Sequence, residues 1–464
     1  MAYSVPAAFS SVFTGDIVTS ADGAAFEAVL ERWAVNAQRK AAIVVLPKSA
    51  QDIALALQHI NLPIAVKCGG HSVGGASSCE DGLVIDLSRY LNGVRIDAEG
   101  KRAYVAGGAV WKTVDEEAIK HGLAAVGGTV NHTGVGGVTL GGGYGWLSGR
   151  QGLAIDNLIS ATVVTASGEI LEVSENLNQE LFGGIRGGGS NFGIVSEFVF
   201  QLHVQRPTVY AGSLVFLRTP ELLSNVKALL NDFWASAGTD DAVFMFVGFN
   251  HGGNVPIISL TVFHNGSREA GEAKFKPFVD LGPIMNSVGE IPYEKANTLL
   301  NEFAGSGLNR HVEGLSLDPS KLFAPEDTTL AQACDRQSES GSMVSFILEL
   351  LPIKTIQSRD TEGRCAFRGR DLCNGMVLLT WPKDQEFLSG EAAALAGSFA
   401  KELGRPGSAA YSNYDSVLAE SARDEQRAEK QFGTAYPRLQ LLKAQYDPAM
   451  RFNRWFPITL TACS

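Results

Sequence analysis

The hydrophobic residues in the first part of the chain form short, β-branched runs separated by turn residues. Ile43–Leu46 is one such run, and Ile64–Lys67, opened by Pro63, is the next. Between them, Ser49-Ala-Gln-Asp52 has the spacing of a helix-capping box, which predicts a helix that ends near Ile60. The same pattern predicts further strands at residues 83–87, 94–97, 102–106, 158–165, 170–173 and 193–202, and a helix that begins near residue 110.

After Pro207 the apolar runs become longer and predict a different architecture. Helical spacing near Glu221–Ala235 and Glu386–Glu402 predicts two helices that cover one face of a large sheet. The strands of that sheet are predicted at Tyr210–Leu217, Val243–Phe249, Ile257–Phe263, Ser345–Leu350 and Met376–Trp381. The fold class is therefore α+β, with predicted parts at residues 1–205, 206–404 and 405–464.

Composition and charge exclude several classes of function. The chain has 464 residues, 45% of them hydrophobic, and a formal net charge of −11. An acidic surface argues against binding to nucleic acid or to anionic membranes. No apolar run approaches the 18 residues of a transmembrane helix, and the first residues lack the pattern of a secretory signal. We therefore expect a cytoplasmic protein, although secretion of a trimmed mature form stays open; oligomeric state is not readable from the sequence.

The six cysteines include no Cys-x-x-Cys pair, and the histidines form no metal-binding motif, so no metal site is predicted. The informative residue is glycine, with 51 copies gathered in two clusters, residues 127–149 and 183–193. Both clusters also carry large apolar residues, which flexible linkers lack. Dense glycine of this kind indicates a backbone that passes close to a cofactor. The spacing of a Rossmann or Walker A motif is absent, so another architecture must bind it.

A third glycine-rich segment, Cys68-Gly-Gly-His-Ser-Val-Gly-Gly75, follows the predicted strand Ile64–Lys67. Its backbone N–H groups are suited to cradle a pyrophosphate. His71 lies in the middle of this turn. A single histidine is most often structural, but one flanked by glycines on a tight turn has few neighbours to pack it in place. His71 is therefore a candidate functional residue.

With these segments in view, the chain resembles the berberine-bridge-enzyme-like oxidases of the vanillyl-alcohol-oxidase superfamily. The FAD-attachment motif of that family is similar to the segment around His71. Four further motifs follow in the family's order and span nearly the whole chain: Gly134-Val-Gly-Gly-Val-Thr-Leu-Gly-Gly-Gly-Tyr-Gly145 with Gly152-Leu-Ala-Ile-Asp-Asn157, Arg186-Gly-Gly-Gly-Ser-Asn-Phe-Gly193, Tyr411-Ser-Asn-Tyr414, and Asp447-Pro448 with Phe452-Asn453. The resemblance implies a two-subdomain FAD-binding domain of the p-cresol-methylhydroxylase type, to which the C-terminal segment returns. A substrate domain with a large antiparallel sheet completes the expected fold.

The resemblance also implies roles for individual residues. His71 would bond the flavin 8α carbon. Tyr411 and Asn413 would approach the flavin, and if they lie on a strand they share one face, which favours Tyr411 over Tyr414 as the residue that faces the substrate. The other residues expected to contact FAD are Gly69, Gly70, Ser72, Gly74, Gly75, Thr133, Gly134, Gly137, Gly141, Gly142, Gly145, Asn157, Ile194, Val195 and Asn453.

The chain departs from the family pattern at three positions. Many relatives attach FAD a second time through a cysteine, but the corresponding residue is Val130, so a single covalent link through His71 is predicted. Val138 replaces a histidine that bonds the flavin edge in relatives, and His132 is a possible substitute. Thr133 stands where a relative's residue gates oxygen, and its size leaves room for O₂.

The predicted activity is that of an FAD-dependent oxidase. A hydride would leave a C–H bond of an alcohol, amine, phenol or natural product, and O₂ would become H₂O₂. Tyr411 is the first candidate for the base and His132 the second, with Glu349 and Asp371 as alternatives from the substrate sheet. Tyr411 would need a nearby cation such as Arg370 to lower its pKa. Three readings stay open beside the oxidase: a dehydrogenase, an isomerase or cyclase with structural FAD, and a non-catalytic binding protein.

Overall fold

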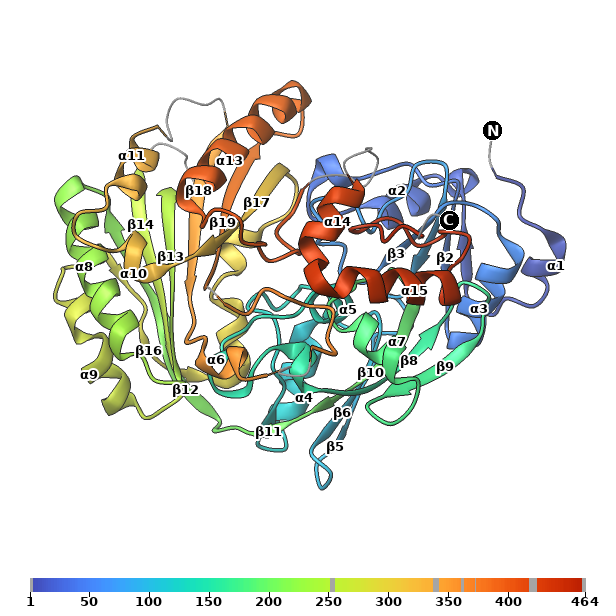
Figure 1. The fold of residues 1–464 in the computed structure, drawn as a ribbon, viewed down its shortest axis with the longest axis horizontal. Helices are drawn as coiled ribbons and strands as arrows, with labels where there is room; N and C mark the ends of the chain where they lie inside the picture. Colours follow the sequence, from blue (N-terminus) through green and yellow to red (C-terminus); the bar gives the residue numbers. More distant parts are fainter. Residues whose placement is uncertain are drawn as a thin grey trace.

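A computed structural model describes residues 3–250, 255–336, 342–359, 363–371, 373–416 and 424–460. The chain folds into two lobes that lie side by side (Figure 1). In one lobe, a four-stranded sheet has the order β1-β2-β4-β3, in which β2, β4 and β3 are parallel. Its elements are β1 (Asp16–Val18), β2 (Ile43–Leu46), β3 (Ile64–Lys67), β4 (Leu83–Asp86), α1 (Ala7–Ser10), α2 (Ala24–Leu30) and α3 (Ala50–His59).

Helix α3 begins where the sequence predicts it. The hydroxyl of Ser49 accepts a hydrogen bond from the backbone N–H of Asp52, as expected of an N-cap residue. The apolar side of the helix, including Ile53 and Leu57, packs on the sheet. Strands β2 and β4 are buried throughout and β3 is buried at Ile64 and Ala65, which explains why the sequence shows apolar runs there rather than an alternating pattern. Strand β3 ends at the turn that carries His71.

A second, antiparallel sheet completes this lobe, with the order β5-β6-β10-β8-β9. Helices α4 and α7 and the C-terminal helices pack around its core, where Trp111 and Phe182 are fully buried. The elements are β5 (Val94–Asp97), β6 (Arg102–Ala106), α4 (Trp111–Ile119), α5 (Val135–Leu140), α6 (Ser148–Gln151), β8 (Leu158–Val164), β9 (Ile170–Ser174), α7 (Gln179–Ile185), β10 (Ile194–Gln201), α14 (Asp424–Phe432) and α15 (Tyr436–Tyr446), with the small pair β7 (Leu123–Ala124) and β11 (His203–Val204).

The other lobe is built on one eight-stranded antiparallel sheet, in the order β15-β12-β14-β13-β18-β19-β17, with β16 also paired to β12. Helices cover its outer face, on the left and top of Figure 1. The elements are β12 (Thr208–Leu217), α8 (Pro220–Ser236), β13 (Asp241–Phe249), β14 (Pro256–His264), α9 (Arg268–Val279), β15 (Met285–Asn286), β16 (Gly289–Pro292), β17 (Asn309–Leu317), α10 (Pro319–Leu322), α11 (Thr329–Arg336), β18 (Met343–Leu350), α12 (Lys354–Gln357), β19 (Cys373–Trp381) and α13 (Ser389–Leu403).

Strand alternation divides the side chains of this sheet between two environments. On β13, Val243 and Met245 point into the core under the helices, while Phe244 and Phe246 point to the opposite face. That opposite face is turned toward the first lobe. It supplies one wall of the cavity described below. The residues that alternate with the core positions along each strand are therefore the ones that can contact a ligand.

The α+β fold predicted from the sequence is present, and the domain limits at residues 205 and 404 stay a prediction. One local expectation was wrong. Residues 411–414 form a turn rather than a strand, closed by a hydrogen bond from the N–H of Tyr414 to the carbonyl of Tyr411, and Asp415 then forms an isolated bridge with Glu313. Residues on a turn do not alternate between faces, so the argument that favoured Tyr411 over Tyr414 fails. No helix in the described ranges is both long and apolar enough to cross a membrane.

Candidate cofactor and substrate site

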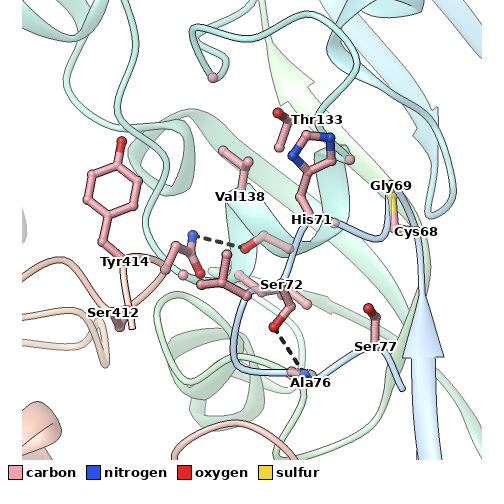
Figure 2. Close-up of a pocket in the computed structure, with 18 of the residues that line it drawn as sticks. Cys68, Gly69, His71, Ser72, Ala76, Ser77, Thr133, Val138, Ser412 and Tyr414 are labelled. Carbon is pink, nitrogen blue, oxygen red and sulfur yellow. Dashed lines mark hydrogen bonds between the residues drawn. The ribbon is translucent and has the colours of Figure 1, made fainter. Parts of the chain in front are cut away.

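The turn after β3 brings His71 to the edge of a large cavity between the lobes. Gly70 and Gly75 have φ values of 72° and 75°, which glycine adopts at little cost. The hydroxyl of Ser72 accepts a hydrogen bond from the N–H of Ala76, at 3.0 Å, across the same turn (Figure 2). Gly69 lies so close to the backbone of Gly134 that an added Cβ would fall 2.4 Å from its nitrogen. Two glycine-rich segments far apart in sequence therefore meet at this wall.

Three side chains fix the imidazole of His71. Its Nε2 lies 2.8 Å from Nδ1 of His132, and the indole of Trp33 stacks on it with ring centroids 5.2 Å apart. The guanidinium of Arg310 lies over that indole in turn, 4.1 Å from its centroid. Burial, followed by His132 and Arg310, lowers the pKa of His71 to about 3. His71 is therefore a neutral imidazole across the physiological pH range.

The turn at residues 411–414, from the C-terminal part of the chain, forms another part of the cavity wall. The hydroxyl of Tyr411 accepts hydrogen bonds from Nδ2 of Asn413, at 2.8 Å, and from the N–H of Gly143, at 3.2 Å. Burial raises its pKa. Arg370, which the sequence suggested as a cation that lowers this pKa, is instead paired with Asp156 at 2.7 Å. The structure therefore argues against Tyr411 as the base and leaves its hydroxyl suited to donate a hydrogen bond.

The inner face of the eight-stranded sheet presents a carboxyl group to the cavity. Glu349 on β18 is 3% exposed, and its Oε1 accepts a hydrogen bond from the hydroxyl of Tyr414 at 2.6 Å. Its Oε2 is buried, with no hydrogen-bond partner among the described residues. Asn374 lies opposite on β19; its Nδ2 makes no hydrogen bond of ordinary length and angle within the described part of the chain, but the amide is near enough to lower the pKa of Glu349 in part. Burial raises the pKa of Glu349 to about 7. On the other side, Phe244 of β13 lies directly opposite and faces the cavity.

A buried carboxyl of this kind in an apolar wall is a candidate for acid–base chemistry. Its pKa is close to neutral, the value that general acid–base catalysis favours. The aromatic lining around it belongs to Phe244, Phe246 and Phe303, with Phe246 and Phe303 stacked at 4.4 Å. This half of the cavity therefore suits an apolar organic molecule that carries an ionisable group.

The rest of the cavity fits a large, mixed polar and apolar cofactor such as FAD. Backbone and side chains from both lobes line the cavity, and part of it is open to solvent. The buried hydroxyls of Ser77 and Ser412, both on its lining (Figure 2), have no hydrogen-bond partner among the described residues. Gly137 lines the cavity with nothing within 4 Å of an added Cβ, so any side chain there would occupy ligand space.

Most residues that the sequence predicts around the cofactor line this cavity, although their contact with FAD stays a prediction. They are Gly69, Gly70, His71, Ser72, Gly74, Thr133, Gly134, Gly137, Gly141, Ile194, Val195, Tyr411 and Asn413. Val138 and Val130, the positions that depart from the family pattern, also line it. Segments spread over more than 340 residues of sequence are thus brought together around one space.

The other predicted site residues have different surroundings. Gly75, Gly142, Gly145, Asn157, Asn453 and His132 lie outside the cavity lining. Asn157 donates to the backbone carbonyls of Gln151 and Leu153, so it shapes the loop that follows the glycine-rich motif. Gly145 packs directly on the backbone of Gly127, and Asn453 is exposed. His132 reaches His71 rather than the substrate side, which argues against it as the substrate's base.

Three comparisons with known proteins bear on this arrangement. Residues 41–174 match the FAD binding domain family. An FAD-linked oxidoreductase of Aspergillus terreus, pgmH, is 31% identical over 93% of this chain and 91% of its own length. The chain belongs to the FAD-linked oxidoreductases. (R)-6-hydroxynicotine oxidase of Paenarthrobacter nicotinovorans is 27% identical over 94% of the chain and 95% of that enzyme.

Solved structures agree with the fold of this oxidoreductase. The 6-hydroxy-D-nicotine oxidase of Arthrobacter nicotinovorans superposes with a TM-score of 0.83 at 27% identity, over 96% of this chain and 98% of the other. A variant of berberine bridge enzyme gives a TM-score of 0.83 at 19% identity, over 98% and 99% of the two chains. The match to the FAD binding domain family and the identity to an FAD-linked oxidoreductase show that the cofactor is FAD. They confirm the prediction that the chain is an FAD-linked oxidoreductase.

Sequence reasoning missed Trp33, which borders the cavity. Tyr414 and Glu349, which the sequence offered only as alternatives to Tyr411, also line the cavity. Trp33 lies in no recognisable motif, and only the tertiary fold brings it to His71. For Glu349 a signal was available: it is the one charged residue in the apolar strand Met343–Leu350. A charge in a buried strand requires a partner or a function.

Proposed function

We propose that this oxidoreductase is an oxidase of apolar organic molecules in which Glu349 takes a proton from a hydroxyl, phenol or amine of the substrate. The single observation that carries the proposal is the buried carboxyl of Glu349, a residue that lines the cavity and whose Oε2 lacks a hydrogen-bond partner among the described residues. FAD, when bound, accepts the hydrogen and electron pair of the adjacent C–H bond and passes the electrons to O₂. The remaining chemistry belongs to side chains of this chain.

Glu349 is suited to this task because its carboxyl group is poised between its two protonation states near pH 7. The ionised form accepts the substrate proton through Oε2, while Tyr414 keeps Oε1 oriented through its hydrogen bond. The apolar surroundings raise the free energy of the carboxylate and so strengthen it as a base. A substrate that supplies an O–H or N–H group also satisfies the oxygen that lacks a partner.

Tyr411 supports the substrate from the other side. Two donors already occupy its hydroxyl oxygen, so its own proton is the group that it can offer. We propose that this proton is donated to the oxygen or nitrogen of the substrate. Phe244, Phe246 and Phe303 exclude water and hold the apolar part of the molecule.

FAD would be held covalently by His71 alone. The imidazole is neutral and lies on the cavity wall, and the position of a second attachment is Val130, which cannot form a thioether. The turn at residues 69–75 and the glycines of α5 and its flanks would hold the polar parts of the cofactor. Electron transfer to O₂ is supported by the oxidase named among the relatives and by Thr133 on the cavity wall.

Reoxidation in air tests the oxidase without knowledge of the substrate. The holoenzyme is reduced with dithionite, mixed with aerated buffer in a stopped-flow cell and followed by flavin absorbance and by H₂O₂ production. We expect rapid reoxidation with one H₂O₂ for each flavin. Reoxidation no faster than that of free reduced flavin would instead make the chain a dehydrogenase.

The proton acceptor is tested with a panel of aromatic alcohols, phenols and amines. Anaerobic bleaching of the flavin identifies a substrate, and the rate of bleaching is then measured over a range of pH on both sides of neutrality. For the wild type we expect a rate that rises through about pH 7. Glu349→Gln should lose about a hundredfold or more in rate together with this pH step, whereas Tyr414→Phe should retain the step. A Glu349→Gln variant with the wild-type pH profile would contradict the assignment.

A further inference from the structure

The contact between His71 and His132 joins two parts of the chain that are 61 residues apart. Their ring centroids are 4.8 Å apart and the planes are inclined by 36°, so the two nitrogens meet edge to edge. His132 lies outside the cavity lining. Its neighbour in sequence, Thr133, is on the lining and is labelled in Figure 2. A second histidine in direct contact with the cofactor-attaching residue is a feature that the proposed substrate chemistry does not use.

The orientation of His71 is imposed by protein groups alone. Trp33 stacks on the imidazole, and its own Nε1 donates to the carbonyl of Ala304 at 2.7 Å. The carbonyl of Trp33 accepts a hydrogen bond from Nη1 of Arg310 at 2.6 Å. The ring plane is thus set by Trp33, and rotation of the ring is set by the bond from Nε2 to His132. The other ring nitrogen, Nδ1, is not engaged by that bond.

The charge states of His71 and His132 decide which of the two rings donates the proton in the hydrogen bond between them. Burial lowers the pKa of His132, and burial together with His132 and Arg310 lowers that of His71. Two neutral imidazoles hold one proton in the bond between them. When His71 is the donor, its Nδ1 has a free lone pair, which is the form of imidazole that acts as a nucleophile.

We propose that His132 accepts the Nε2 proton of His71 as His71 becomes bonded to FAD through Nδ1. A C–N bond forms between Nδ1 and the 8α carbon, and one C–H bond of that methyl group is broken. His132 removes the Nε2 proton, so the attached imidazole ends neutral rather than cationic. The two electrons left on the cofactor pass to dioxygen. His132 is thus a positioning and proton-accepting residue for attachment, and this inference rests on the proposed link through His71.

The test measures covalent attachment directly. Purified holoenzyme is precipitated with acid, and flavin absorbance is compared between pellet and supernatant. His132→Ala should retain FAD by non-covalent binding, with a covalent fraction about tenfold or more below the wild type after equal exposure to FAD and air. The matched control is His121→Ala, which removes an exposed histidine away from the cavity and should leave the covalent fraction unchanged. Added imidazole should restore attachment in His132→Ala.

Two further readouts separate proton transfer from simple positioning. Glutamine at this position can hydrogen-bond to His71 but cannot take its proton, so His132→Gln should stay as poorly attached as His132→Ala. A His132→Gln variant that attaches FAD like the wild type would overturn the proton-accepting role. NMR of the flavin peptide released by proteolysis should place the bond at Nδ1, and a bond at Nε2 would overturn the proposal. If the wild type itself has no pellet-bound flavin, the proposed link through His71 fails instead, and with it the premise.

Discussion

Replacing Glu349 with glutamine should stabilise the protein at alkaline pH while it removes activity. Burial raises the pKa of this carboxyl from 4.5 to about 7. At pH values below the pKa of this carboxyl in the unfolded state, the group is protonated in both states and does not change the free energy of unfolding. As pH rises above the unfolded value, the unfolded state ionises first, and the native state loses stability until pH passes the folded value. At about 1.4 kcal/mol for each pKa unit, the full loss is about 3 kcal/mol.

The glutamine of Glu349→Gln would keep the hydrogen bond from Tyr414 and carry no charge, so the stability of this variant should lack this pH dependence. The measurement is urea unfolding of the holoenzyme, followed by flavin absorbance and tryptophan fluorescence, at one pH below 4.5 and one above 7. The free energy of unfolding of Glu349→Gln minus that of the wild type should be about 3 kcal/mol larger at the higher pH than at the lower one. Tyr414→Phe is the control, because it removes the hydrogen bond and keeps the carboxyl. An equal difference between wild type and Glu349→Gln at both pH values would refute the reasoning.

Three other substitutions test separate features. Lys443→Met leaves Asp447 buried without its 2.7 Å ion-pair partner, and it should lower the free energy of unfolding by about 3–5 kcal/mol in urea titrations; an unchanged midpoint would contradict this. Gly137→Ala should fold with wild-type stability but bind less flavin, since its Cβ enters the cavity, whereas Gly69→Ala should fail to fold because its Cβ meets backbone; flavin content and circular dichroism tell the two apart. Tyr411→Phe should lower the rate of flavin reduction about tenfold or more and leave its pH profile unchanged, and a shifted profile would restore Tyr411 as the base.

Much of the fold was predictable because the local pattern of apolar and turn residues indicates most of the strands and helices. The runs at Ile43–Leu46 and Ile64–Lys67 coincide with the strands of the structure. Other elements were missed although a signal was present. In α9, Gly271, Phe275 and Phe278 are buried at helical spacing, but the many charged residues between them obscure the pattern.

The site was less predictable because its chemistry depends on contacts between distant segments. The glycine-rich motifs locate the cofactor wall, because a backbone that passes close to another group requires glycine, and clustered glycines are visible in the sequence. The roles of individual side chains produce no comparable sequence pattern. Tyr411 was preferred as base on an assumed strand, and its raised pKa follows from burial that no local pattern reveals. Glu349 gains its near-neutral pKa in the same way, from the apolar strands beside it.

The alternation along β13 and β18 has a consequence for how enzymes of this kind diversify. Phe244, Phe246 and Ile347 face the cavity, while Val243 and Met245 pack between the sheet and its helices. Selection for a new substrate can therefore act on every second residue without disturbing the folding core. A mutant library restricted to the ligand-facing positions should yield mostly folded, flavin-containing proteins with altered preference. The same number of changes at the core positions should yield mostly insoluble ones.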